Sequence, residues 1–302
     1  MKTGKVRKVI FPVGGLGTRF LPATKSMPKE MLPVVDKPLI HYAFEEAKAA
    51  GIEQFIFVTG RNKHAIEDHF DHVYELQSHL SKKNKNRELE LTSNWLPEPG
   101  NVCFVRQQEP RGLGHAVWCA RHLIGDEPFA VILADDMVLS KKTCLQQMTE
   151  AFKTCDGNIL GVMDIPREKT SSYGIVDIDT KAKTPDKRLI KAKALVEKPT
   201  PKEAPSTLSI IGRYILQPEI FNILDKHTTG TGGEIQLTDA INKMIGKSSV
   251  HGFQFEGIRY DCGSLSGFVA ANVAYALERK DASKMVLDEL KEVFKRNGNT
   301  LS

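Results

Sequence analysis

Short apolar runs alternate with amphipathic segments through the first half of the chain. Runs with the β-branched and aromatic composition of strands lie at residues 6–13, 54–59, 102–105 and 129–134. Apolar residues at helical spacing predict helices at residues 38–50, 62–82, 113–124 and 141–153. Strands that alternate with helices form a largely parallel sheet that is covered by helices on both faces. The pattern therefore predicts an α/β fold.

After about residue 155, strand patterns follow one another through turns more often than through helices. Strands are predicted at residues 159–163, 174–178, 189–197, 208–216 and 250–255, and helices at residues 217–226, 235–245, 266–280 and 282–296. This part is expected to be mixed and to extend the first sheet. The last helix either packs on its own domain, which is the commoner use of an amphipathic helix, or forms an oligomer contact.

The composition narrows the class of protein. The 302 residues include 42 Lys and Arg against 37 Asp and Glu, and the resulting charge of +5 is too small to indicate a nucleic-acid partner. No apolar run approaches the ~20 residues of a membrane helix, and the start lacks a signal-peptide pattern. Five cysteines without a CxxC pair indicate neither a disulfide framework nor a zinc cluster. We expect a cytoplasmic protein that binds neither membrane nor nucleic acid.

A glycine-rich turn follows the first predicted strand. It reads Gly-Gly-Leu-Gly-Thr-Arg at residues 14–19. Such a turn brings backbone N–H groups within reach of a phosphate, and Arg19 adds a forked donor. A dinucleotide fingerprint would require glycine at Phe20, and no Walker A sequence occurs. The turn either binds phosphate in another register or is purely structural.

Charged side chains after two strands are further candidates. Lys25 and Lys29 lie in a proline-rich loop after the glycine turn, where they are either solvated or phosphate-binding. Asp135 and Asp136 follow the apolar run 129–134, where carboxylates hold a hard cation or cap the next helix. Histidines at positions 64 and 72 with an aspartate at 68 have metal-ligand spacing, but a solvated helix face is the favoured interpretation.

Several motifs together resemble the sugar-1-phosphate nucleotidylyltransferases. They are GGLGTR at 14–19, PKEMLPVVDKP at 28–38, RQQEPRGLGHA at 106–116, LADD at 133–136, SYGIV at 172–176, VEKP at 196–199, GEIQLTD at 233–239 and YDCG at 260–263. The resemblance runs from about residue 6 to residue 280. The combination of RQQEPxGLGHAV, GEIQLTDAI and DCG is typical of the uridylyltransferase branch of that family.

The resemblance implies a Rossmann-like three-layer α/β/α nucleotidyltransferase fold with a central mixed, mostly parallel sheet. It implies a catalytic domain at 1–280, with a nucleotide-binding part at about 1–155 and a sugar-phosphate part at about 156–265, followed by a C-terminal helix at 281–302. The implied reaction joins UTP and glucose 1-phosphate into UDP-glucose and pyrophosphate, without a covalent enzyme intermediate. Another nucleotide such as dTTP or CTP, or a catalytically weak regulatory role, remains the alternative. A homodimer or homotetramer is also implied.

The resemblance also assigns roles to individual residues. The implied nucleotide-binding residues are Gly14, Gly15, Gly17, Thr18, Gln107 and Gly112. The implied sugar-phosphate-binding residues are Gly174, Glu197, Lys198, Arg213 and Glu234. Asp135 and Asp261 are implied to hold Mg²⁺, and Arg19, Lys29 and Lys198 to be the catalytic cations. Asp136 stands where relatives carry an apolar residue, so its role is left open.

Overall fold

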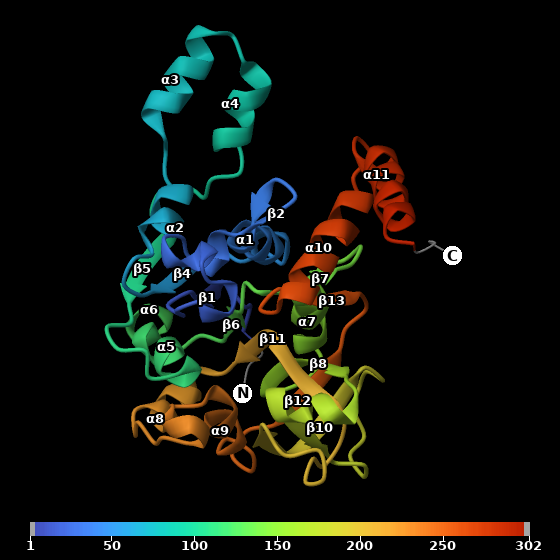
Figure 1. Ribbon diagram of the computed structural model, residues 1–302. Coiled ribbons are helices and arrows are strands. Elements are labelled where there is room, and N and C mark those ends of the chain that lie inside the picture. Colours follow the sequence, from blue (N-terminus) through green and yellow to red (C-terminus); the bar gives the residue numbers. More distant parts are fainter. Residues whose placement is uncertain (1–3, 299–302) are drawn as a thin grey trace.

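The protein is built around a nine-stranded sheet with the order β5-β4-β1-β6-β11-β8-β12-β10-β9. The computed structural model describes residues 4–298 (Figure 1), so residues 1–3 and 299–302 at the ends of the two predicted domain segments lie outside the described part. The strands of this sheet are β1 (Lys8–Pro12), β4 (Gln54–Thr59), β5 (Val102–Arg106), β6 (Phe129–Ile132), β8 (Asn158–Asp164), β9 (Gly174–Ile178), β10 (Leu189–Glu197), β11 (Leu208–Leu216) and β12 (Val250–Gln254).

The sheet is mixed, as predicted. Strands β5, β4, β1 and β6 are parallel, as are β8 and β12, whereas β11 runs antiparallel to β6 and β8 and β10 runs antiparallel to β9 and β12. Parallel neighbours need a crossover of a dozen or more residues, and the first half supplies these as helices. The link between β9 and β10 is too short for one, so antiparallel pairing is concentrated in the second half.

Helices cover both faces of the sheet. The α-helices are α1 (Leu39–Ala49), α2 (His64–His69), α3 (Tyr74–Lys82), α4 (Asn86–Ser93), α5 (Leu113–Cys119), α6 (Arg121–Ile124), α7 (Cys144–Phe152), α8 (Phe221–Leu224), α9 (Leu237–Asn242), α10 (Leu265–Leu277) and α11 (Ser283–Arg296). Side chains alternate across a strand, so Phe11 of β1 packs in one core with Phe44 of α1. Its neighbour Ile10 packs in a second core with Val117 of α5. The predicted three-layer architecture is confirmed.

Shorter elements complete the fold. They are the strand pairs β2 (Pro33–Val34) with β3 (Lys37–Pro38) and β7 (Asp136–Leu139) with β13 (Ile258–Asp261), and the 3₁₀ helices η1 (Thr18–Phe20), η2 (Ala23–Lys25), η3 (Lys29–Met31), η4 (Arg167–Ser172), η5 (Pro218–Ile220) and η6 (Thr231–Gly233). The pairing of β13 with β7 is important for the site, because it brings residues near position 260 beside Asp136.

The prediction of one long helix over residues 62–82 is wrong. Helix α2 ends at His69, and α3 and α4 form an arm that extends away from the sheet (Figure 1). Phe70 turns into the core, and the Asp71 side chain accepts a hydrogen bond from the N–H of His72, which competes with helical bonding at this point. His69 packs against Trp95 and not on a solvated face.

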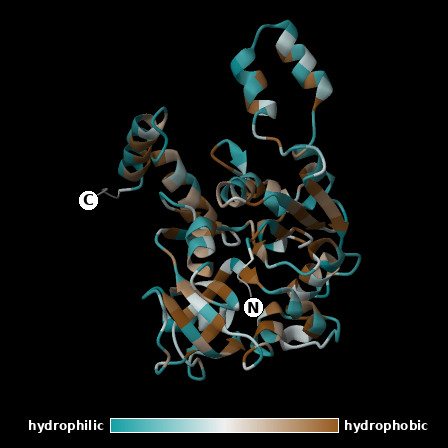
Figure 2. Cartoon of the chain, turned by 180° about the vertical axis from the view of Figure 1, so that it is seen from behind, coloured by the Kyte–Doolittle hydropathy of each residue, from teal (hydrophilic) through white to brown (hydrophobic). Residues whose placement is uncertain are grey.

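The predicted C-terminal helix is confirmed as α11, which forms a hairpin with α10. Apolar side chains on this hairpin stay exposed, among them Val269, Leu277, Met285, Leu287 and Val293. Figure 2 shows brown apolar segments in the sheet and a mixture of brown and teal on the hairpin. Within residues 4–298, no helix is both long enough and apolar enough to span a bilayer.

Candidate active site

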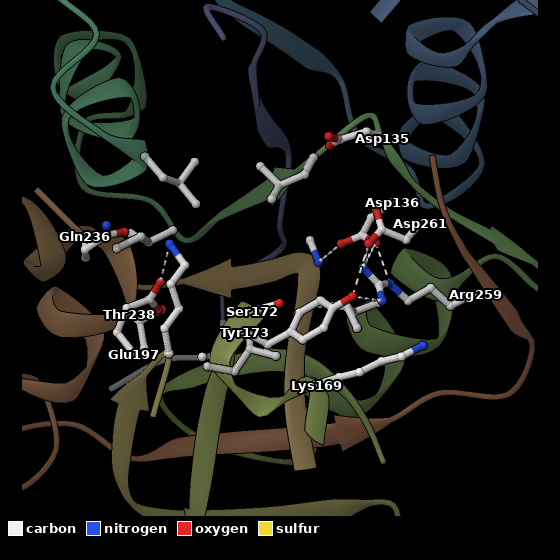
Figure 3. Close-up of a pocket in the computed structure, with 18 of the residues that line it drawn as sticks. Asp135, Asp136, Lys169, Ser172, Tyr173, Glu197, Gln236, Thr238, Arg259 and Asp261 are labelled. Atoms are coloured by element: carbon white, nitrogen blue, oxygen red, sulfur yellow. Dashed lines mark hydrogen bonds and ion pairs between the residues drawn. The ribbon is translucent and has the colours of Figure 1, made fainter. Parts of the chain in front are cut away.

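A cavity of about 660 Å³ opens at the carboxyl end of β6, between the loop after β1 and the strands of the second half. Among the residues that line it are Arg19, Asp135, Gly174, Glu197, Lys198, Glu234 and Asp261, all of which carry roles implied by the sequence resemblance. Figure 3 shows Asp136, Arg259 and Asp261 gathered at one side of this cavity and Glu197 with Thr238 at another. The tertiary fold therefore gathers residues that are up to 242 positions apart (Arg19 to Asp261).

The glycine turn forms a second, adjoining cavity of about 430 Å³. Gly15, Gly17, Thr18 and Arg19 line this cavity together with Lys29. Gly17 has φ +68°, and a Cβ added there would lie 3.1 Å from the Cβ of Lys29, so the close approach of the two loops requires glycine. The turn is therefore packed against the loop that carries Lys29.

Two aspartates converge on Gly263. A Cβ added to Gly263 would lie 3.0 Å from Oδ1 of Asp261, 3.2 Å from Oδ2 of Asp135 and 3.3 Å from Nη1 of Arg19. The backbone holds this arrangement, because the N–H of Cys262 donates to the carbonyl of Asp135 at 2.7 Å. The missing side chain of Gly263 thus leaves a small cradle between two carboxylates and a guanidinium.

Lys29 forms an ion pair with Asp135, with 2.5 Å between Nζ and Oδ2. Burial raises the pKa of Asp135, but the adjacent Lys29 outweighs burial, and the pKa is lowered overall. Burial likewise lowers the pKa of Lys29, whereas the Asp135 charge raises it, and the net shift is upward. Both groups are therefore charged at neutral pH.

A buried ion pair holds the loop that carries Lys29 in place. Nζ of Lys63 lies 2.8 Å from Oε2 of Glu30, and the two residues are 5% and 2% exposed. Because Glu30 is adjacent to Lys29 in the chain, this pair fixes the position of the catalytic candidate. Sequence reasoning missed Glu30 and Lys63, since nothing in their spacing indicates that the two residues meet.

Asp136, whose role the sequence left open, orients Arg259. The Asp136 carboxylate accepts a hydrogen bond from the N–H of Gly212 at 2.7 Å and forms an ion pair with the Arg259 guanidinium. Arg259 in turn donates to the Tyr173 hydroxyl, which donates to Oδ2 of Asp261; both distances are 3.1 Å. Asp136 therefore acts on Asp261 through Arg259, a residue that sequence reasoning missed.

Glu197 and Lys198 lie on the opposite side of the cavity. Nζ of Lys198 is 3.4 Å from Oε1 of Glu197, and the Lys198 N–H donates to the Tyr173 carbonyl at 3.0 Å. Lys198 has φ +49°, a conformation that costs energy for a side chain with a Cβ and that is enriched at functional sites. Gly174 is required by packing, since a Cβ there would lie 2.9 Å from Oγ1 of Thr238.

Arg213 does not belong to this cavity, which corrects the expectation that it binds the sugar phosphate. Its side chain is 2% exposed and forms a two-pronged ion pair with Glu46 of α1, with distances of 2.9 Å and 2.8 Å. Successive residues of a strand point to opposite faces. Gly212 and Tyr214 line the cavity, so Arg213 between them points to the α1 and α7 side.

The remaining nucleotide-binding candidates form a cluster next to the glycine turn. Nε2 of Gln107 donates to the carbonyl of Gly112 at 3.2 Å, and Oε1 of Gln107 lies beside Gly14. Gly112 has φ +106°, and a Cβ there would lie 2.8 Å from the Cβ of Glu234. Glycine is therefore required where the 109–114 loop packs against Glu234 and Ile235.

Residues at 64, 68 and 72 form no metal centre. Within the described part of the chain, no group of three or more His, Cys, Asp or Glu side chains is arranged to hold a metal ion. Asp135 and Asp261 would give a cation two protein oxygens, and its other ligands would come from water or from a bound phosphate.

A glycine-rich turn, a pair of carboxylates and several cations line adjoining cavities, an arrangement that suits a substrate with phosphate groups. The profile of the family described as nucleotidyl transferase matches residues 8–278, and the chain belongs to that family. Within it, the chain is 50% identical over 277 residues to the UTP–glucose-1-phosphate uridylyltransferase of Bacillus subtilis (strain 168), covering 92% of this chain and 93% of the relative.

Solved structures agree with this relationship. The chain resembles a UTP-bound UGPase from Acinetobacter baumannii with a TM-score of 0.85 and 40% identity, over 94% of this chain and 98% of the other. It also resembles a UDP-glucose pyrophosphorylase complexed with UDP-glucose, with a TM-score of 0.79 and 42% identity, over 91% of this chain and 100% of the other.

Proposed function

We propose that this protein transfers the uridylyl group of UTP to glucose 1-phosphate, giving UDP-glucose and pyrophosphate. The observation that carries the proposal is the convergence of Arg19, Lys29 and Lys198 with Asp135 and Asp261 around adjoining cavities. Two polyanions must meet for this reaction, and the cations supply the charge that their meeting requires. The relatives named above, which align over nearly the whole chain, support the same assignment.

The two cavities divide the substrates between them. The triphosphate lies along the turn at 14–18, with its base toward Gln107 and Gly112, in the nucleotide-binding part of about 1–155. The sugar phosphate lies against Gly174, Glu197 and Glu234 in the sugar-phosphate part of about 156–265. Carboxylates such as Glu197 accept hydrogen bonds from sugar hydroxyls.

Asp135 and Asp261, whose carboxylates both face Gly263, are a donor pair that suits a divalent cation. Two carboxylate oxygens that face one small space are the hard donors that Mg²⁺ prefers, and this ion usually binds through one or two carboxylates plus substrate phosphates. Asp135 and Asp261 would hold the ion, which would supply neutralisation of phosphate charge. Lys29 bridges to Asp135, so the same carboxylate serves the cation and the lysine.

The side chains then position the reactants and neutralise charge. The phosphate of glucose 1-phosphate attacks the α-phosphorus in line and pyrophosphate leaves; because the nucleophile is already an anion, no strong base is needed. Arg19 holds the leaving phosphates, Lys29 contacts the reacting phosphoryl group, and Lys198 holds the incoming phosphate. Removing one such cation costs about 2–4 kcal/mol of transition-state stabilisation.

The cysteines and the α10–α11 hairpin support a cytoplasmic location and an oligomeric state. All five cysteines, which lie in the described part of the chain, are unpaired, as in a reducing cytoplasm. The exposed apolar side chains of α10 and α11 support a homodimer or homotetramer that is joined through this hairpin.

The proposal is tested by a panel of five nucleoside triphosphates with glucose 1-phosphate, in which pyrophosphate release is measured. UTP is expected to be the best donor. A dTTP or CTP preference would point to the alternative enzyme, and no turnover with any of them would point to a regulatory paralogue.

The role of Lys29 is tested with saturating substrates. Lys29→Ala is expected to lower kcat by about 30- to 1,000-fold, which corresponds to the loss given above. Lys187→Ala, which removes an exposed lysine from the loop between β9 and β10, is the control and should keep wild-type turnover. Near-normal turnover of Lys29→Ala would contradict the mechanism.

A further inference from the structure

The hydrogen bonds of Gln107 determine which way its amide faces. Nε2 lies 3.2 Å from the carbonyl oxygen of Gly112. A carbonyl oxygen can only accept, so the amide nitrogen must be the atom that faces it. The amide oxygen therefore faces the other way, toward Gly14, where an added Cβ would lie only 3.0 Å from Oε1.

His115 provides a second acceptor for the same amide nitrogen. Its Nδ1 lies 3.1 Å from Nε2 of Gln107, and the residue is 7% exposed. Burial, followed by the charge of Arg111 and the nearby His227, lowers the pKa of His115, so the ring is neutral at neutral pH. A neutral ring with its proton on Nε2 leaves the Nδ1 lone pair free to accept.

The position of the His115 ring is itself fixed. It stacks on Trp118 with ring centres 5.6 Å apart and an interplanar angle of 20°. The indole N–H of Trp118 donates to Oδ1 of Asp225 at 2.5 Å. The ring is therefore anchored by packing that does not involve the nucleotide, and it is suited to hold another side chain in place.

The amide oxygen of Gln107 is left available. Among residues 4–298, no group donates a hydrogen bond to this oxygen. The oxygen is also not fully buried, so a ligand can reach it. Gly14, which it faces, is the first residue of the phosphate-binding turn and lies next to Gly15 of the triphosphate cavity. In the proposed function the base of the bound triphosphate lies toward Gln107, so this acceptor is available to it.

We propose that His115 is a positioning residue that locks the Gln107 amide with its oxygen toward the base and thereby selects bases with a ring N–H. The inference rests on the proposed function, in which Gln107 reads the base. Uracil offers its N3–H to Oε1. Cytosine in the same pose brings an unprotonated N3 against Oε1, so two acceptors face each other.

Without His115, one of the two acceptors that hold Nε2 is lost. The amide can then turn over more easily and offer its nitrogen to N3 of cytosine. The expected consequence is a loss of discrimination between UTP and CTP, with a smaller effect on catalysis itself. A residue that only stabilised the fold would weaken both nucleotides alike and leave their ratio unchanged.

Three variants separate these roles. His115→Phe keeps a ring against Trp118 but removes the acceptor, and His115→Asn keeps an acceptor near the position of Nδ1. His227→Phe changes a ring 5.9 Å from that of His115, and it is the matched control. For each variant, kcat/KM is measured with UTP and with CTP. The equilibrium Kd of each nucleotide is measured in the absence of sugar phosphate. His115→Leu replaces His115→Phe if the latter does not fold.

Wild type is expected to favour UTP over CTP about tenfold or more in both measurements. His115→Phe should lower this ratio by about three- to tenfold, the effect of one neutral hydrogen bond, whereas His115→Asn and His227→Phe should stay within about twofold of wild type. An unchanged ratio in His115→Phe, or an equal fall in His227→Phe, would overturn the inference. Selective UTP binding without turnover would instead refute the proposed reaction and leave the role of His115 intact.

Discussion

Replacing Arg213 by methionine tests whether this residue serves stability or substrate binding. Its guanidinium lies 2.9 Å and 2.8 Å from the two oxygens of Glu46 and donates to the carbonyls of Leu133 and Gly212 at 3.1 Å and 3.0 Å. Arg213→Met removes all four contacts and fills a similar volume. It leaves a buried carboxylate without its cation, and of the residues that line the substrate cavity only Leu133 and Gly212 lose a backbone contact.

The expected loss of stability is large. Removing one partner of a buried ion pair costs about 3–5 kcal/mol, because the remaining charge stays buried and unpaired. For a chain of this length, each kcal/mol lowers Tm by about 2 °C, so Tm should fall by about 6–10 °C. Burial lowers the pKa of Arg213, but the charge of Glu46 outweighs burial and raises it overall, so the arginine is charged at every accessible pH.

A double variant identifies the cause. Glu46→Leu combined with Arg213→Met removes the unpaired charge and should recover most of the lost stability. Recovery will be incomplete, because Oε1 of Glu46 also accepts from the N–H of Leu145 at 2.9 Å. That N–H then has lost its partner, at a cost of about 1–3 kcal/mol.

Thermal and urea unfolding measure stability, and steady-state kinetics at a temperature well below Tm measure the KM for glucose 1-phosphate. The KM of folded Arg213→Met should stay within about twofold of wild type, since the side chain lies on the α1 side of β11. The reasoning is refuted if KM rises tenfold or more while Tm is unchanged. That result would return Arg213 to the sugar-phosphate site.

Three further predictions concern pH and metal dependence. Burial raises the pKa of Glu30 above its usual 4.5. In Lys63→Met, folded Glu30 therefore keeps its proton at pH values where Glu30 of the unfolded chain has released it. The stability of this variant in urea, relative to wild type, should fall as the pH rises from 5 to 8; a pH-independent loss would contradict this. Burial lowers the pKa of His69 to about 4 from 6.5, so wild type should lose stability as the pH falls through that window. His69→Phe should lose less between pH 7 and pH 5, and an equal loss would exclude His69 as the cause. Asp261→Asn should raise the Mg²⁺ concentration for half-maximal activity about tenfold or more, whereas Asp281→Asn at an exposed site should not; equal metal dependence would exclude Asp261 as a ligand.

Much of the fold could be predicted from local sequence pattern. The runs that became β4, β9, β10 and β11 were predicted with the bounds that the structure has, because strand-forming residues recur along each of them. The prediction of a helix over 62–82 failed, since the apolar spacing continued past Phe70 to Val73 and Leu76, whose side chains face solvent. Periodicity indicates which side chains can share a face, but the arm of α3 and α4 has no core beside it.

The candidate site likewise contains features that the sequence predicts and contacts that only the structure reveals. The glycine turn could be predicted from the sequence because its proposed chemistry is local: residues 14–19 form one glycine-rich loop that lines a cavity. The orientation of Arg213 was not readable, since a shift of one residue along β11 exchanges the core face for the cavity face. The sequence could not indicate that Asp136 meets Arg259, or Lys63 meets Glu30, because these contacts join segments whose spacing in the chain carries no signal.

The sequence by itself determined most helices and strands of this protein and its glycine-rich turn, because backbone propensity and side-chain periodicity act locally. Long-range packing decided the rest: the convergence of Asp135 and Asp261 beside Gly263 requires that β13 pair with β7. That pairing depends on the free energy gained when both halves of the sheet are buried together. No single segment of the sequence determines this free energy. The physical reason is that periodicity acts over a few residues, whereas a site of opposed charges forms only where distant segments are held together.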